Sequence, residues 1–92
     1  MILSFKQKEL KKFHISGKGK LPQAKHQRRV AIILDLLNAA IDVQDMNFPG
    51  SNLHKLEPRS DERYSVKVSG NWRIVFVFKA GDASEIEYVD YH

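Results

Sequence analysis

The sequence has 92 residues, of which 42% are hydrophobic and none is cysteine, and it carries a formal net charge of +4. This length predicts one domain over residues 1–92 that buries roughly 60 to 65% of its unfolded surface, and the lack of cysteine excludes disulfides and thiolate metal sites. The opening MILSFKQKELKKF has no apolar run of the kind that a signal peptide or membrane span requires, so we expect a cytoplasmic protein with no membrane partner.

The first half of the chain predicts a strand followed by two helices. Residues 1–5 are short and apolar enough for a strand, and residues 6–15 are rich in helix formers that Gly17 can stop. After the basic connection GKGKLP, Pro22 suits the first turn of a second helix. That helix carries an apolar stripe at helical spacing, formed by Val30, Ile33, Leu34, Leu37 and Ile41.

The second half changes to the period of two that is typical of strands. A loop over residues 42–52 contains the turn pair Pro49-Gly50, and YSVKVSGNWRIVFVFKAGDASEIEYVDY then predicts three strands joined by turns at Ser69-Gly70 and 80–82. The expected fold is α+β: an N-terminal strand, two helices and a C-terminal antiparallel three-strand meander, with the helices on one face of the sheet.

Alternation assigns the two faces of this sheet. One face should lie under the helices, and its side chains are Tyr64, Val66, Val68, Trp72, Ile74, Phe76, Phe78, Ile86 and Tyr88. The opposite face is mixed and partly open, and its side chains are Ser65, Lys67, Arg73, Val75, Val77, Lys79, Glu85 and Glu87. An open, charged sheet face is a natural binding surface.

The positive charge is concentrated at the N-terminal end. Residues 1–30 hold nine lysines or arginines against one acid, net +8, whereas residues 31–92 hold six against ten, net −4. This asymmetry indicates a polyanionic partner such as nucleic acid. A solvated helical face kept soluble by lysines explains it equally well.

Two of the four histidines could take part in catalysis. His14 and His26 lie among basic residues on helical segments, where we expect surface roles, whereas His54 follows the Pro49-Gly50 turn and His92 is the last residue. With Asp90 and Tyr91, His54 and His92 supply the groups that acid–base chemistry near neutral pH requires.

Two interpretations of this set stay open. His54, Asp90 and His92 could bind a divalent metal, although no HxH or HExxH spacing supports this. Alternatively, they cleave an RNA phosphodiester without metal or other cofactor, and Arg73 stabilises the charged phosphorane. Arg73 could instead be the cross-strand partner of Glu85 or Glu87.

The stretch LHKLEPRSDERYSVKVSGNWRIVFVFKAGDASEIEYVDYH resembles the C-terminal part of HigB toxins, the "killer protein" branch of the RelE-like superfamily. The most specific pieces are Leu53-His54, NWRI at 71–74, Gly81-Asp82-Ala83 and the terminal DYH. The preceding basic strand and helix pair also match the family's layout, so the resemblance covers the whole domain.

The resemblance implies a type II toxin that cleaves mRNA in the A site of the 70S ribosome and is neutralised by a HigA-like helix-turn-helix antitoxin. On matching positions, the implied catalytic residues are His54, Arg73, Asp90, Tyr91 and His92. We further expect RNA contacts from Lys55, Arg59, Lys67 and Asn71. One departure is Glu57-Pro58 after Leu56, where the family often has Leu-Lys-Gly, so that Lys55 or Arg59 would have to replace a lysine that faces phosphate.

Alternation presents a difficulty for a single site. In a regular strand Asp90 and His92 continue the Ile86/Tyr88 face, whereas Tyr91 shares the face of Arg73. All five residues can meet only if the strand twists or bulges near its end, or if the helix layer stops short of it. A non-catalytic basic RNA- or ribosome-binding module remains the alternative function.

Overall fold

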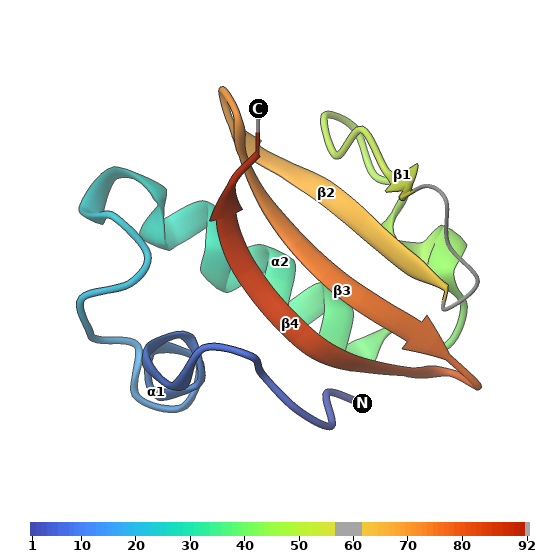
Figure 1. Ribbon diagram of the computed structural model, residues 1–92, viewed down its shortest axis with the longest axis horizontal. Coiled ribbons are helices and arrows are strands. Elements are labelled where there is room, and N and C mark those ends of the chain that lie inside the picture. Colours follow the sequence, from blue (N-terminus) through green and yellow to red (C-terminus); the bar gives the residue numbers. More distant parts are fainter. Residues whose placement is uncertain (57–61, 92) are drawn as a thin grey trace.

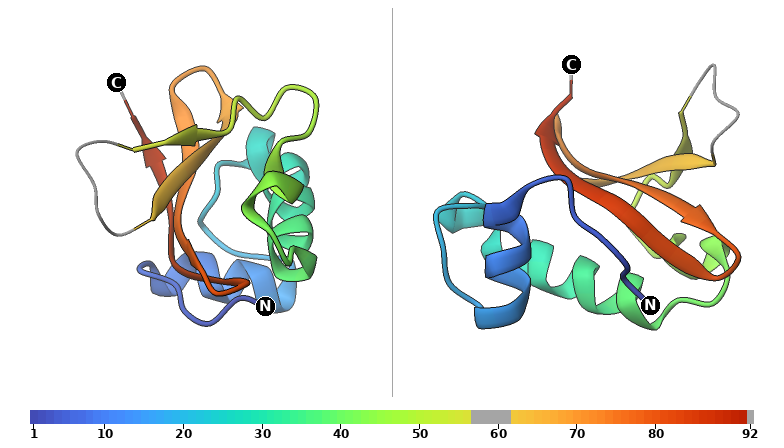
Figure 2. Two further views of the ribbon diagram at one scale, coloured as in Figure 1. Left: turned by 90° about the vertical axis from the view of Figure 1, so that its right-hand side faces the viewer. Right: turned by 60° about the horizontal axis from the view of Figure 1, so that its bottom comes forward.

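The computed structural model describes residues 1–56 and 62–91 and confirms the α+β fold. Two helices precede one antiparallel sheet in sequence, α1 at Lys8–Ser16 and α2 at Gln27–Ala39. The sheet has the strand order β1-β2-β3-β4, with β1 at His54–Lys55, β2 at Arg63–Ser69, β3 at Trp72–Lys79 and β4 at Asp82–Asp90. Figure 1 shows α2 running across one face of the sheet, and Figure 2 shows both helices on that side.

The predicted three-strand meander is present as β2, β3 and β4, and the structure adds one short strand. This strand, β1, has two residues and pairs with the outer edge of β2. The predicted N-terminal strand is an extended segment that follows the edge of β4. It touches β4 through two isolated parallel bridges, Ile2 with Ala83 and Phe5 with Ile86.

Gly17 ends α1 as predicted. Its φ of 77° lies in the left-handed region, and its N–H donates to the Phe13 carbonyl at 2.7 Å. Glycine adopts this conformation without the steric penalty that a Cβ adds. Leu10 and Phe13 of α1 are buried in the core, so the helix packs by one apolar edge.

The start of the second helix differs from the prediction. Pro22 does not lie in its first turn: a 3₁₀ turn, η1 at Ala24–His26, comes first and α2 begins only at Gln27. The reason is a tertiary contact, because the segment is tied to the Tyr88 hydroxyl of β4. The Gln23 N–H donates to that oxygen at 3.3 Å, and Nδ1 of His26 lies 2.6 Å from it.

His26 was therefore wrongly predicted to be a surface residue, since only 4% of it is exposed. The Tyr88 oxygen accepts from Gln23, so its own proton is available to Nδ1 of a neutral imidazole. Burial, with a smaller effect of the Lys25 charge, lowers the pKa of His26 and favours that neutral form. His14, by contrast, is half-buried beside the Phe5 ring.

Ile41 was also wrongly placed in the apolar stripe of the second helix. The other four stripe residues are buried, but α2 ends at Ala39 and Ile41 is 82% exposed. The chain turns here because Asp42 and Asp45 form a capping box on a second 3₁₀ turn, η2 at Val43–Met46. That box fixes the exit direction of the chain and leaves Ile41 in solvent.

The helix-facing side of the sheet is the predicted one. Its side chains form one core cluster with α1 and α2, and the sheet contributes Val66, Val68, Ile74, Phe76, Phe78, Ala83, Ile86 and Tyr88. Tyr64 and Trp72 pack against this cluster. Full burial of each large apolar side chain contributes roughly 1.5 to 3 kcal/mol, so this layer stabilises the sheet that carries the opposite face.

A bulge in β4 changes the side-chain alternation upstream of the strand's end. Val77 pairs with Ser84 but Val75 pairs with Glu87, so β4 contains an additional residue, and Glu85 there has a φ of 51°. Beyond the bulge the pairing is regular, with Val89 opposite Arg73 and Asp90 opposite Trp72. The strand therefore bulges, as one alternative predicted, but near its middle and not at its end.

Candidate active site

A hollow of about 350 Å³ opens on the sheet face that points away from the helices. Three of the predicted catalytic residues line it, namely His54, Arg73 and Tyr91, together with the predicted RNA-binding residue Asn71. The other lining residues are Leu56, Ser65 and Gly70. The sheet thus brings together residues that lie almost 40 positions apart in the sequence.

Backbone pairing explains how these residues meet. His54 on β1 lies opposite Ser65 on β2, and Arg73 on β3 lies opposite Val89 on β4. Tyr91 follows Val89 by two positions and therefore shares the Arg73 face, as alternation predicted. The Tyr91 N–H donates to the Asn71 carbonyl at 2.7 Å, which fixes the chain beyond β4 beside the β2–β3 turn.

Arg73 is held by the sheet in the middle of the hollow. Its Nη1 donates to the Ser65 hydroxyl at 2.9 Å. Glu85 pairs instead with Arg63 at 3.6 Å and Glu87 with Lys6 at 3.8 Å. Within the described residues Arg73 is therefore not the ion-pair partner of Glu85 or Glu87, the alternative that the sequence left open.

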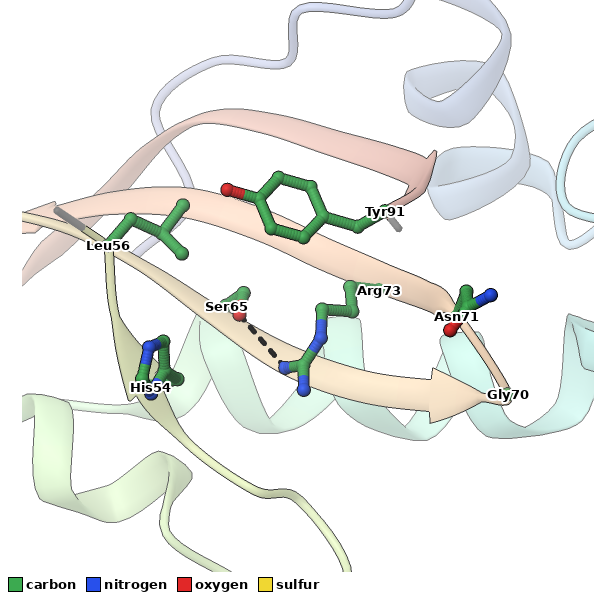
Figure 3. A pocket seen from close by; sticks show the side chains of 7 residues that line it. All are labelled: His54, Leu56, Ser65, Gly70, Asn71, Arg73 and Tyr91. Carbon is green, nitrogen blue, oxygen red and sulfur yellow. Dashed lines mark hydrogen bonds between the residues drawn. The ribbon is translucent and has the colours of Figure 1, made fainter.

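Figure 3 shows the His54 ring, the Arg73 guanidinium and the Tyr91 ring around the same hollow, each on a different strand or strand end. His54 is exposed and Tyr91 is 51% exposed, so a ligand can reach both side chains. A planar cation near an imidazole and a phenol suits a phosphodiester in which the attacking oxygen gives up a proton and the leaving oxygen gains one.

A second cation stands next to Arg73. Lys67 on β2 is the direct cross-strand partner of Arg73 and is half-buried on the same face. Like charges directly opposite each other on two strands are destabilising, by up to about 1 kcal/mol. Arg73 lines the hollow and Lys67 does not, so an anion bound there would contact Arg73 and feel the Lys67 charge from one strand away.

Asp90 does not line the hollow. It lies opposite Trp72, which packs on the helix side. By alternation it shares the face of Tyr88, two positions earlier, where its charge is a minor cause, after burial, of the raised pKa of Tyr88. His92 lies outside the described residues, so the structure brings together three of the five predicted catalytic residues.

The remaining predicted RNA contacts are more scattered. The Lys55 ammonium lies over the Tyr64 ring, 5.9 Å from its centroid, on a residue that packs toward the core. Arg59 and Glu57 lie outside the described residues, and the departure at Glu57 with them. Lys67 and Asn71 are the two predicted contacts beside the catalytic candidates.

Ser65, Leu56 and Gly70 were given no function from the sequence. Alternation placed Ser65 on the correct face, but a serine between strand residues normally indicates solvent exposure and not a contact to an arginine. Leu56 follows a strand of two residues, which is too short for its periodicity to be recognised. Only the tertiary fold shows that they line one hollow.

Within residues 1–56 and 62–91, no three histidine or acidic side chains gather in a group that could hold a metal ion. The alternative metal site on His54, Asp90 and His92 includes a residue outside these ranges. In the same ranges, no helix is long and apolar enough to span a bilayer.

Comparison with known proteins gives two matches. A family model described as "RelE-like toxin of type II toxin-antitoxin system HigB" matches residues 3–92. The Endoribonuclease HigB of Proteus vulgaris is 35% identical over 92 residues, which is the full length of both chains. Both matches extend over every residue that lines the hollow.

Proposed function

Because this chain belongs to the RelE-like toxins of type II toxin–antitoxin system HigB, we propose that it is an endoribonuclease that cuts the mRNA codon in the ribosomal A site. The cut would stop translation. The observation that carries this proposal is the arrangement of His54, Arg73 and Tyr91 in one accessible hollow. Such an arrangement would offer an acid–base pair and a phosphate-binding cation.

The proposed reaction is transesterification within the RNA. A general base takes the proton of a ribose 2′-hydroxyl, the 2′ oxygen bonds to the adjacent phosphorus, and the bond from phosphorus to the 5′ oxygen breaks. A general acid returns a proton to that 5′ oxygen. The products are a 2′,3′-cyclic phosphate and a 5′-hydroxyl, and neither water nor a metal takes part in the bond changes.

In this reaction His54 and Tyr91 are the described acid–base candidates. They line the hollow together with Arg73, so one could serve the attacking oxygen and the other the leaving oxygen of a phosphate that the guanidinium holds. We propose His54 as the base and Tyr91 as the acid, with His92 the alternative for either role. Asp90 would act on a histidine through its charge, from beside the hollow.

Arg73, with Lys67 one strand away, would give the site its affinity for phosphate. Arg73 can present a planar fork to two phosphate oxygens, whereas Lys67 is a point charge one strand away. An approaching phosphate relieves their mutual repulsion and gains attraction from both. Exposed basic residues of the first third, including Lys18, Lys20, Lys25 and Arg28, would extend this attraction toward ribosomal RNA.

As a member of a type II toxin–antitoxin family, the chain has an antitoxin as its partner. We propose that this antitoxin is a small HigA-like helix-turn-helix protein and that the complex acts in the cytoplasm. An adjacent reading frame that encodes such a protein would support this assignment.

The experiment is cleavage of a defined mRNA on programmed ribosomes. Untagged protein should give codon-positioned cuts with 5′-hydroxyl ends, with and without a chelator that ribosomes tolerate. His54→Ala should lose the cuts but still co-sediment with ribosomes, and His14→Ala serves as the matched histidine control. Tight ribosome binding by the wild type without any cut would establish the alternative, a non-catalytic RNA- or ribosome-binding module.

A further inference from the structure

We propose that Ser65 is a positioning residue that aims the Arg73 guanidinium at the scissile phosphate, an inference that rests on the function proposed above. The Ser65 hydroxyl accepts a hydrogen bond from Nη1 of Arg73 at 2.9 Å. Both residues line the hollow. Ser65 is buried and has no place in the acid–base chemistry itself.

The strand register shows what this bond does. Ser65 lies opposite His54 on one side and opposite Val75 on the other, so Arg73 stands two residues along β3 from its direct neighbour. The Arg73 side chain must therefore cross diagonally over β2 to reach the hydroxyl, as Figure 3 shows. The bond draws the guanidinium toward His54.

The cation opposite Arg73 gives this contact a role in setting the direction of the side chain. Lys67 is the direct cross-strand neighbour of Arg73 and repels it. An arginine side chain has several rotatable bonds, and without a fixed acceptor it would turn toward solvent, away from Lys67. One hydrogen bond to Ser65 selects the inward direction and leaves the other guanidinium N–H groups for phosphate oxygens.

Stability alone does not explain a serine at this position. Only 1% of Ser65 is exposed, and it lies opposite Val75 within a strand, where a β-branched apolar side chain would pack better. A buried hydroxyl is unfavourable unless it is hydrogen-bonded, and this one accepts from the Arg73 guanidinium. Replacing the serine should therefore change the reaction much more than the fold.

The test is a double-mutant cycle in the ribosome-dependent cleavage assay. Ser65→Ala should lower the cleavage rate at saturating protein roughly tenfold, since a hydrogen bond to a charged group is lost, with little change in the half-saturating concentration. In an Arg73→Ala background the same substitution should have no further effect, because the group that it positions is absent. Ser84→Ala, a strand serine outside the hollow, is the matched control.

Two further variants keep the test decisive if alanine disturbs the buried position. Ser65→Thr keeps the oxygen and should retain most of the rate, whereas Ser65→Cys keeps the volume but offers a poor acceptor and should behave like alanine. An unchanged rate in Ser65→Ala, or an equal tenfold loss in the Arg73→Ala background, would overturn the inference. A wild type that never cleaves would instead overturn the proposed function.

Discussion

Replacing Tyr88 with phenylalanine removes one oxygen from a buried polar cluster and leaves the rest of the side chain in place. That oxygen accepts the Gln23 N–H at 3.3 Å and lies 2.6 Å from Nδ1 of His26. The ring itself stacks on Trp72 with centroids 4.5 Å apart, and phenylalanine can keep that contact. The substitution therefore tests the hydrogen bonds alone.

The expected loss follows from the burial of both partners. Tyr88 is 2% exposed and His26 is 4% exposed, so water cannot easily replace the lost hydroxyl. Leaving a buried polar group without its hydrogen-bond partner lowers the free energy of unfolding by about 1 to 3 kcal/mol. For a domain of this size, a loss of about 2 kcal/mol lowers the Tm by roughly 8 to 16 °C.

Urea and thermal unfolding at pH 8, followed by circular dichroism, measure this loss. Tyr64→Phe is the matched control, because Tyr64 is a half-buried tyrosine of the same sheet face whose hydroxyl makes no hydrogen bond among the described residues. Tyr88→Phe should be clearly less stable than this control. Equal stability of the two variants would refute the assignment of the cluster as a structural link between η1 and β4.

Other predictions concern pH, turn geometry and phosphate binding. The pKa of His26 is lowered in the folded protein from its ordinary value of 6.5, so below that pH the unfolded chain binds more protons than the folded one. The contribution of His26 to stability should therefore be fully present above pH 6.5 and fall as the pH drops. This dependence should disappear in His26→Gln. Asp42→Ala removes the capping box of η2 and should lower the free energy of unfolding by about 1 kcal/mol, and an unchanged urea midpoint would contradict this. Gly17→Ala should lower the free energy of unfolding by about 1 kcal/mol, because the φ of Gly17 is 77°. No atom lies within 4 Å of the added Cβ, so the loss would come from backbone strain and not from a clash. A stability equal to that of the wild type would rule out this strain. Arg73→Ala should reduce cleavage about 100-fold. Arg73→Lys should restore only part of that rate, and full recovery with lysine would exclude a planar fork.

Local patterns predicted the parts of the fold that depend on neighbours in sequence. The alternation of β2, β3 and β4 assigned Arg73 and Tyr91 to one face, and the turn glycines separated the strands. The prediction that Gly17 ends the first helix was correct for the same reason, since a left-handed cap depends on the conformation of a single residue. Each of these predictions needed only periodicity or the steric freedom of glycine.

The errors came from contacts over long sequence distances. His26 is surrounded by basic residues in the sequence, and its true partner, Tyr88, is 62 positions away. Pro22 suited a helix start, but the tie from Gln23 to the same hydroxyl delays the helix to Gln27. No local sequence pattern reports contacts between residues so far apart. Tertiary packing therefore determines both the burial of His26 and the start of α2.

The candidate site was predictable in part for the same reason. The residue types and the resemblance indicated His54 and Tyr91, and alternation put Tyr91 beside Arg73. The contact between Ser65 and Arg73 could not be predicted, because it depends on the register of β2 against β3 and on the direction of one long side chain. For Asp90 alternation predicted the correct face, the one that it shares with Tyr88. Because the hollow lies on the opposite face, Asp90 does not line it.

The proposed function requires that this hollow cleave RNA through the substrate's own 2′-hydroxyl. The most direct measurement compares two mRNAs on programmed ribosomes, which are identical except that one has a single 2′-deoxynucleotide on the 5′ side of the cut. The wild-type protein should cut the all-ribose mRNA to a 2′,3′-cyclic phosphate and a 5′-hydroxyl and leave the deoxy mRNA intact. Cutting of both mRNAs at equal rates, or of neither, would contradict the proposed reaction.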